Sequence, residues 1–243
     1  MILITRPFKK AKFLEQKLKK NKIVSHIDSL LSFHLRTRKY KFEYYTDYIV
    51  TSTQSVLSLK NNYRESLRLL RNKSFYVVGN EVSNELKKIK ITKIKKIFKN
   101  SADLYNYLKT KNLCKRKFCY LSGSVSNTLL LKKLKLLKLS FDRVILYTSK
   151  PKKNFSKSTI NYFNQNKIKY VLLYSTYTLH VYLSLINKMK LKRKVQNVTH
   201  LCLSREIASI IKKEGFKKVS HSEVPTETSM LKSLYHVIIK GNN

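Results

Sequence analysis

Short runs of apolar and β-branched residues recur along the chain, and most are separated by stretches in which apolar residues stand three or four positions apart. The short runs predict strands, and the stretches between them predict helices. The predicted strands span residues 2–5, 48–51, 75–78, 118–121, 143–147, 170–174 and 199–203. Strands that alternate with helices form parallel sheets. The pattern therefore indicates an α/β protein, with too many βα units for one small sheet.

The clearest helical stretch follows the second predicted strand. Its apolar residues step by three or four positions, as one face of a helix requires. They are Val56, Leu59, Tyr63, Leu67 and Leu70. The spacing predicts a helix over residues 56–70, and similar spacing is present in 129–139 and 181–186.

A faint internal repeat indicates two related halves. Residues 47–59 resemble residues 170–182, and residues 75–79 resemble residues 200–204. In each half, a strand, a small or hydroxyl residue and a helix are followed by a second unit of the same kind. Basic segments at about 33–42 and 147–153 are the expected crossings between the halves. Two crossings imply that the chain leaves one domain, builds the other and returns.

The charge is strongly unbalanced, with 52 Lys and Arg residues against 13 acids and a formal net charge of +39. Such a surplus fits an anionic partner such as nucleic acid, a membrane or a polyacid. The lysines are spread over the whole chain, whereas a nucleic-acid arm concentrates them. Lys, Asn, Ile, Tyr and Phe are abundant and Trp is absent, which is typical of an AT-rich genome. Codon bias is therefore the main interpretation.

Cysteine and histidine usage points away from disulfides and metals. Cys114, Cys119 and Cys202 have neither zinc spacing nor a disulfide framework, and the six histidines show no metal-ligand spacing. We expect buried free thiols in a reducing cytosol. No apolar run reaches the roughly 18 residues of a membrane span, and a strand at the N-terminus leaves no room for a signal peptide. A cytoplasmic protein is expected.

Small hydroxyl residues or glycine follow five of the predicted strands. These positions are Thr51-Ser52-Thr53, Gly79-Asn80, Ser122-Gly123-Ser124, Ser175-Thr176 and Ser204-Arg205. The ends of parallel strands share one edge of the sheet, where helix N-termini offer backbone N–H groups and a partial positive charge. Each residue taken alone can be a simple helix cap. Together they predict a site for an anionic ligand, and their pattern does not name it.

Eight segments, in order along the whole chain, resemble the uroporphyrinogen-III synthase family. They are residues 2–7 (Ile-Leu-Ile-Thr-Arg-Pro), 47–56, 76–80, 120–124, 143–148, 170–176, 203–208 and 225–231. The resemblance implies two parallel-sheet, flavodoxin-like α/β domains with the active site between them. The first domain would comprise residues 1–35 plus 152–243, and the second would comprise 42–146. Residues 36–41 and 147–151 would be the connecting strands.

The same resemblance implies a lyase that closes hydroxymethylbilane, a linear polycarboxylate tetrapyrrole, to uroporphyrinogen III in haem biosynthesis. Hydroxide leaves the terminal hydroxymethyl group, and the last ring is inverted through a spiro intermediate. The resemblance implies no cofactor, no metal and no membrane or nucleic-acid partner. It implies a monomer and allows transient contact with the preceding or following pathway enzyme.

Site residues carry over by position. Tyr147 matches the family's cleft tyrosine and is the candidate proton donor, although a strand-end packing role is the alternative. Substrate carboxylates are expected at the hydroxyls of Ser52, Ser175 and Ser204, at Arg6, and at the backbone amides of Thr53, Gly79, Asn80, Gly123 and Thr176. The chain departs from the family at Val82-Ser83 and at Arg205-Glu206, which places any catalytic role of those family hydroxyls in doubt.

Two other function classes stay open from the sequence. A nucleic-acid-binding protein would account for the net charge of +39 and the 16 tyrosines, but the chain lacks any RNP-like, zinc-finger or helix-turn-helix signature. A non-catalytic, two-lobed α/β protein that binds small anions would share the strand-end residues. Product analysis separates this second alternative from a synthase.

Overall fold

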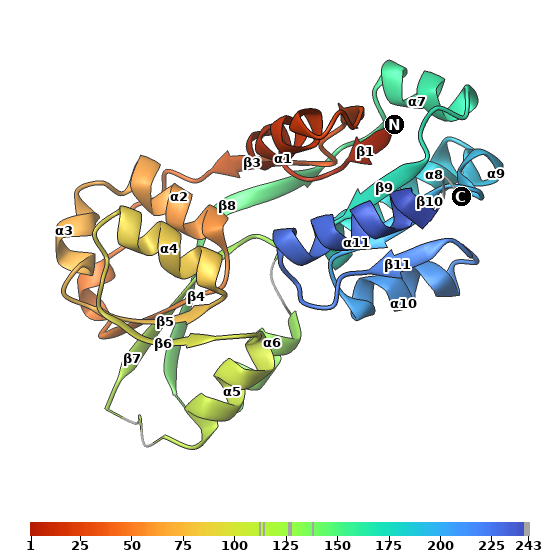
Figure 1. The fold of residues 1–243 in the computed structure, drawn as a ribbon. Coiled ribbons are helices and arrows are strands. Elements are labelled where there is room, and N and C mark those ends of the chain that lie inside the picture. The colour runs from red at the N-terminus through yellow and green to blue at the C-terminus, as the bar shows by residue number, and fades with distance from the viewer. Residues whose placement is uncertain (112, 114, 126–127, 138, 241–243) are drawn as a thin grey trace. The chain divides into compact units, whose positions relative to one another are not determined.

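The chain divides into two compact units. The computed structural model describes residues 1–111, 113, 115–125, 128–137 and 139–240 (Figure 1). Unit 1 comprises Met1–Ser32 and Lys150–Asn243, and unit 2 comprises Phe33–Ser149. The chain therefore begins in unit 1, builds unit 2 and returns, as the two basic crossings indicate.

Unit 1 is built on a five-stranded parallel sheet. In spatial order its strands are β2 (Ser25–Ile27), β1 (Ile2–Ile4), β9 (Tyr170–Leu173), β10 (Thr199–Cys202) and β11 (Val219–His221). Its helices are α1 (Phe8–Lys20), α7 (Lys157–Asn164), α8 (Thr176–Lys188), α9 (Lys192–Val195), α10 (Arg205–Lys213) and α11 (Glu227–Lys240). Numbered along the chain, the strand order is 2-1-3-4-5, which is the flavodoxin-like order.

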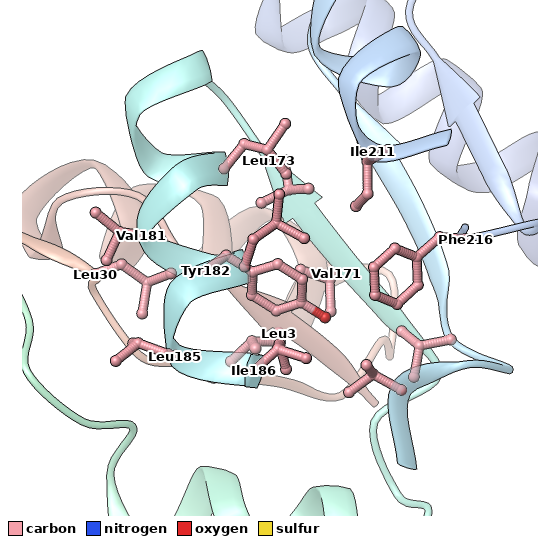
Figure 2. Close-up of a cluster of buried hydrophobic side chains, with 14 of the residues drawn as sticks. Leu3, Leu30, Val171, Leu173, Val181, Tyr182, Leu185, Ile186, Ile211 and Phe216 are labelled. Carbon is pink, nitrogen blue, oxygen red and sulfur yellow. The ribbon is translucent and has the colours of Figure 1, made fainter. Parts of the chain in front are cut away.

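Alternating side chains of β1 and β9 enter two separate cores, one on each face of the sheet. Leu3 and Val171 pack with α8 and α10 in the core that Figure 2 shows. Ile2, Ile4 and Leu172 pack on the other face with α1 and α11. The strands are buried on both faces, which explains their nearly continuous apolar sequences.

Unit 2 is built on a six-stranded sheet. In spatial order its strands are β3 (Leu31–Leu35), β8 (Ser140–Pro151), β7 (Lys117–Gly123), β4 (Asp47–Val50), β5 (Ser74–Val78) and β6 (Ile94–Phe98). The helices are α2 (Thr53–Asn62), α3 (Ser66–Leu70), α4 (Asn80–Lys88), α5 (Ser101–Lys109) and α6 (Thr128–Lys135), with a 3₁₀ turn η1 at Phe42–Tyr44. Strands β4 to β8 run parallel to one another.

The two sheets share one spatial layout but differ in chain order. The set β9, β10, β11 of unit 1 corresponds to β4, β5, β6 of unit 2, and β1, β2 correspond to β7, β8. The internal repeat falls on these equivalent elements, because residues 47–59 form β4 and α2 whereas 170–182 form β9 and α8. The prediction of two parallel-sheet α/β domains is confirmed. The flavodoxin-like order holds for unit 1, whereas the parallel strands of unit 2 have the order 3-2-1-4-5.

Two local predictions are wrong. Residues 36–41 form no strand, and β3 precedes them instead. The helix expected over 56–70 is two helices, α2 and α3, separated at Tyr63. The Tyr63 hydroxyl lies 2.9 Å from the carbonyl oxygen of Arg36. The aromatic side chain at the break thus satisfies a backbone group of the irregular segment after β3.

His200 is a buried ionisable residue whose ring packs edge-to-face against Tyr182 and Phe216, two core residues that Figure 2 labels. Its Nε2 lies 3.0 Å from the Tyr182 hydroxyl, and its side chain is fully buried. Burial lowers the pKa of His200 to about 4, against the backbone hydrogen bonds that would raise it.

We predict a pH dependence of stability from His200. A histidine in an unfolded chain has a pKa near 6.5. Between about pH 6.5 and 4, His200 is therefore protonated in the unfolded chain and neutral in the folded chain. The free energy of unfolding should therefore fall as the pH decreases through this window, by up to about 3 kcal/mol. Urea unfolding of wild type and His200→Gln at several pH values measures the effect. The variant should lose this slope and His236→Gln, an exposed control, should keep it; equal slopes in all three would contradict the assignment.

Candidate functional site

Each sheet contains a pair of adjacent strands whose following helices lie on opposite faces of the sheet. Such a pair is called a switch point, and open α/β sheets bind ligands there. In unit 2, β4 leads to α2 on one face and β7 leads to α6 on the other. In unit 1, β1 leads to α1 and its neighbour β9 leads to α8 on the opposite face. We describe the strand ends at each switch point separately.

Three of the predicted serines are helix caps. Ser52 Oγ accepts a hydrogen bond from Gln54 N at 3.1 Å, and Ser175 Oγ accepts one from Thr178 N at 3.1 Å. Ser204 Oγ accepts one from Ile207 N at 3.4 Å. The capping interpretation is therefore confirmed for these hydroxyls. The first amides of the helices that follow, such as that of Thr53 or Thr176, have no carbonyl partner inside the helix.

Ser52 also contacts the candidate proton donor. Its Oγ lies 3.0 Å from the Tyr147 hydroxyl. The Tyr147 ring is 6% exposed and packs edge-to-face against Phe33, with 5.4 Å between the ring centroids. Burial raises the pKa of Tyr147 and outweighs the hydrogen bonds and the nearby positive charge that lower it. Tyr147 is thus protonated at neutral pH and is able to donate a proton.

Gly123 provides the surface on which the Tyr147 ring lies. A Cβ at position 123 would stand 2.5 Å from two ring atoms of Tyr147. The backbone holds the same residue, because Ser124 N donates to Tyr147 O at 2.8 Å. The requirement for glycine here comes from this close approach.

A β-bulge aims Tyr147 at Ser52. Ser122 pairs with Ile145 and Gly123 pairs with Tyr147, so Leu146 is an extra residue in β8. In a strand without a bulge, the adjacent residues Leu146 and Tyr147 would point to opposite faces of the sheet. With the bulge, both side chains enter the core that contains α2. A bulge of this kind re-aims a side chain.

A second tyrosine at this switch point was missed by the sequence analysis. The Tyr120 hydroxyl lies 2.9 Å from Thr51 Oγ1, and Ser55 Oγ donates to Leu121 O at 3.0 Å. These bonds tie β4 and the start of α2 to β7. The Ser-Thr pattern at positions 51–55 was the available signal, but the partner residues could not be identified from the sequence.

Gly79 and Asn80 begin α4 beside this site. Gly79 has φ +91°, a backbone conformation that favours glycine. Its amide donates to Phe98 O at 2.9 Å. The Gly79 amide already has a partner in this conformation, so a substrate carboxylate would have to displace the Phe98 carbonyl to bind it. The amide of Asn80 lies in the first turn of α4.

Arg6 of unit 1 is buried and paired. Its guanidinium bonds Glu227 at 2.5 Å and lies over the Tyr174 ring, 4.2 Å from the centroid. Lys17 also bonds Glu227. Although burial alone would raise the pKa of Glu227, Lys17 and Arg6 lower it. Arg6 is therefore neither exposed nor unpaired, so a substrate carboxylate would have to displace Glu227.

The structure offers no thiol or metal chemistry within the described residues. No group of three or more His, Cys, Asp or Glu side chains there could hold a metal ion. Cys119 and Cys202 are buried free thiols, as predicted, and burial raises the pKa of both. Cys114 lies outside the described residues. In the same part of the chain, no helix is long and apolar enough to cross a membrane.

Comparisons with known proteins agree on one family. The family model described as uroporphyrinogen-III synthase HemD matches residues 31–232. The solved uroporphyrinogen-III synthetase of Helicobacter pylori aligns with a TM-score of 0.68 at 15% identity, over 97% of this chain and 98% of that one. A mutant uroporphyrinogen III synthase of Thermus thermophilus aligns with a TM-score of 0.64 at 12% identity, over 98% of each chain. A search of curated proteins finds no match.

We predict that Gly123→Ala displaces the Tyr147 ring. The added methyl group cannot occupy a position 2.5 Å from ring atoms, so the ring must move and its bond to Ser52 should be lost. Overpacking of this kind costs about 1–3 kcal/mol. Chemical unfolding of a double-mutant cycle with Tyr147→Ala measures the coupling. Gly123→Ala should destabilise the wild type and cost much less once the ring is removed; equal costs in both backgrounds would show that the two residues are not in contact.

Proposed function

We infer the chemistry of the site from the family: the chain belongs to the uroporphyrinogen-III synthase family. It is a lyase that closes hydroxymethylbilane to uroporphyrinogen III in haem biosynthesis. The roles of individual residues are our proposal. The observation that carries it is the hydrogen-bonded pair of Ser52 and Tyr147 at the switch point of unit 2.

The reaction mainly requires control of geometry. The hydroxyl of the terminal hydroxymethyl group leaves with a proton as water, and the resulting cation is attacked by the substituted carbon of the last ring. The spiro intermediate then rearranges, and loss of a ring proton restores the aromatic pyrrole, so one water is released overall. Closure in solution gives the uninverted isomer I. Holding the last ring in the inverting orientation is therefore the central task of the enzyme.

Tyr147 is the proposed donor of the proton that leaves with the hydroxyl. Its burial keeps the phenol protonated before the reaction, and a general acid must carry its proton when the substrate binds. Ser52 Oγ, at 3.0 Å, orients the phenol and can stabilise it when it has lost the proton. The packing role considered from the sequence is also present, because the ring belongs to the core of unit 2.

Helix N-termini are the proposed binding points for the substrate carboxylates. In unit 2 these are the amides of Thr53 and Asn80, and in unit 1 they are the helix starts at Ser175, Thr176 and Ser204. The Gly123 amide after β7, and Arg6 after exchange from Glu227, would add two further contacts. The N-terminal charge of a helix stabilises a carboxylate. The surplus of lysine would speed the capture of a polyanion. None of these contacts requires a cofactor.

We further propose that the protein works as a monomer in the cytoplasm, with at most transient contact with the enzymes before and after it. The buried free thiols Cys119 and Cys202 are typical of a reducing compartment. A nucleic-acid partner is not proposed, because the basic residues are spread along the chain.

Product analysis tests the function directly. Purified protein is supplied with hydroxymethylbilane, the product is oxidised, and the ratio of isomer III to isomer I is measured by chromatography. We expect isomer III to dominate, since the enzyme closes the ring faster than it closes in solution. Heat-denatured protein is the control. A ratio no higher than in buffer would reject the proposed function.

We predict that Tyr147→Phe lowers kcat by about ten-fold or more, on the order expected for loss of a general acid. The substitution keeps the ring that packs against Phe33 and removes only the hydroxyl. Tyr45→Phe is the control, because Tyr45 OH bonds Asp142 at the opposite end of β8. Steady-state kinetics compares the three proteins. An unchanged rate for Tyr147→Phe would leave Tyr147 with the packing role alone.

A further inference from the structure

Arg143 lies on β8 four residues before Tyr147 and bonds the end of the neighbouring strand β7. Its Nε donates to Ser122 Oγ at 2.9 Å. One terminal nitrogen donates to Gly123 O at 2.6 Å and to Ser124 O at 2.9 Å. A single guanidinium therefore holds three consecutive residues. Charge-assisted bonds from a planar donor fork are strong and fix the orientation of their acceptors.

Two of the three residues that Arg143 holds support Tyr147. Gly123 lies under the Tyr147 ring, and Ser124 N donates to Tyr147 O. Ser124 Oγ also accepts a bond from Ser149 N at 3.1 Å. The bulge at Leu146 lies between Arg143 and Tyr147. Arg143 thus anchors the end of β7, which lies opposite the bulge in β8. The position of this strand end determines where the bulge directs the Tyr147 side chain.

We propose that Arg143 is a positioning residue, which acts through the turn at Ser122–Ser124 to hold the Tyr147 hydroxyl against Ser52. The proposal rests on the proposed function for its catalytic consequence, but its geometric content does not depend on turnover. A misplacement of a reacting group by about 1 Å can lower a rate by roughly a hundred-fold. Loss of the anchor should therefore affect the chemical step more than substrate binding.

The charge of Arg143 supports the same role. It lowers the pKa of Tyr147, against the larger and opposite effect of burial, and the hydrogen bonds of Ser52 and Ser55 act in the same direction as Arg143. A nearby cation eases the loss of a proton from the phenol. Position and charge both favour proton donation at the same atom.

The test compares Arg143→Met and Arg143→Lys with wild type. Methionine removes the donors, whereas lysine keeps the charge but not the planar fork. We expect kcat to fall roughly ten- to a hundred-fold for Arg143→Met with KM changed less than about three-fold, and a smaller fall for Arg143→Lys. Arg116→Met is the matched control, because Arg116 bonds Asp47 at 3.1 Å and is also beside β7, at its opposite end. It should lose stability and keep the wild-type kcat at a temperature below its unfolding.

Two further measurements separate positioning from a general structural role. In the Tyr147→Phe background, Arg143→Met should cause less than a three-fold further loss of kcat, because the group on which it acts is gone. In protein with ¹³C-labelled tyrosine rings, the Tyr147 signal, assigned with Tyr147→Phe, should shift in Arg143→Met and Arg143→Lys and stay unchanged in Arg116→Met.

An unshifted Tyr147 signal in a folded Arg143→Met or Arg143→Lys protein would overturn the proposal. Fully additive losses of kcat in the double variant would also overturn it. If Arg143→Met does not fold, the lysine variant decides both points. If the wild type makes no isomer III, the proposed function fails, while the ring signal still reports whether Arg143 positions Tyr147.

Discussion

The contact between the Tyr147 ring and the bare Cα of Gly123 is the constraint on which the unit 2 site depends. It requires a glycine at the end of β7, where the approach leaves no room for a Cβ. It also requires the extra residue in β8, because an unbroken strand would direct Tyr147 to the other face. Ser52 caps α2 and meets the phenol from the neighbouring strand end. One hydroxyl is therefore fixed from three elements that are distant in sequence.

The sheets of the two units have the same spatial layout of strands but different orders of those strands along the chain. Because β9 corresponds to β4 and β1 to β7, Ser175 is the equivalent of Ser52, and the end of β1 at Thr5 and Arg6 is the equivalent of the Gly123 turn. In unit 2, the backbone of Gly123 lies against the Tyr147 ring. In unit 1, the guanidinium of Arg6 lies over the Tyr174 ring. The equivalent edges thus carry different chemistry. The proposed proton donor belongs to unit 2, and a paired cation belongs to unit 1.

The central strands could be predicted from the sequence because they are buried on both faces and read as continuous apolar runs. The missed strands β2, β6 and β11 lie at sheet edges, and their sequences are polar, as in the Lys95-Lys96 pair inside β6. Edge strands carry such residues to avoid pairing with other chains, and this hides them from a search for apolar runs. The strand β3 was also missed, although its burial alternates as expected for an edge.

The site was partly predictable for a similar reason. Hydroxyl residues after strands indicate helix caps, and Ser52, Ser175 and Ser204 are caps. Long-range partners leave no local pattern. The bond of Arg143 to Ser122, the ion pair of Arg6 with Glu227, and the amide of Gly79 bonded to Phe98 all join residues whose proximity only the fold creates.

A crystal structure with a bound, non-cyclising analogue of hydroxymethylbilane that retains the terminal hydroxymethyl group tests the central claim most directly. The account predicts the hydroxymethyl oxygen within about 2.6–3.2 Å of the Tyr147 hydroxyl, with Ser52 still in contact with the phenol. The account would be contradicted if the hydroxymethyl oxygen lay beside another side chain while Tyr147 remained buried in the core of unit 2, out of contact with the analogue.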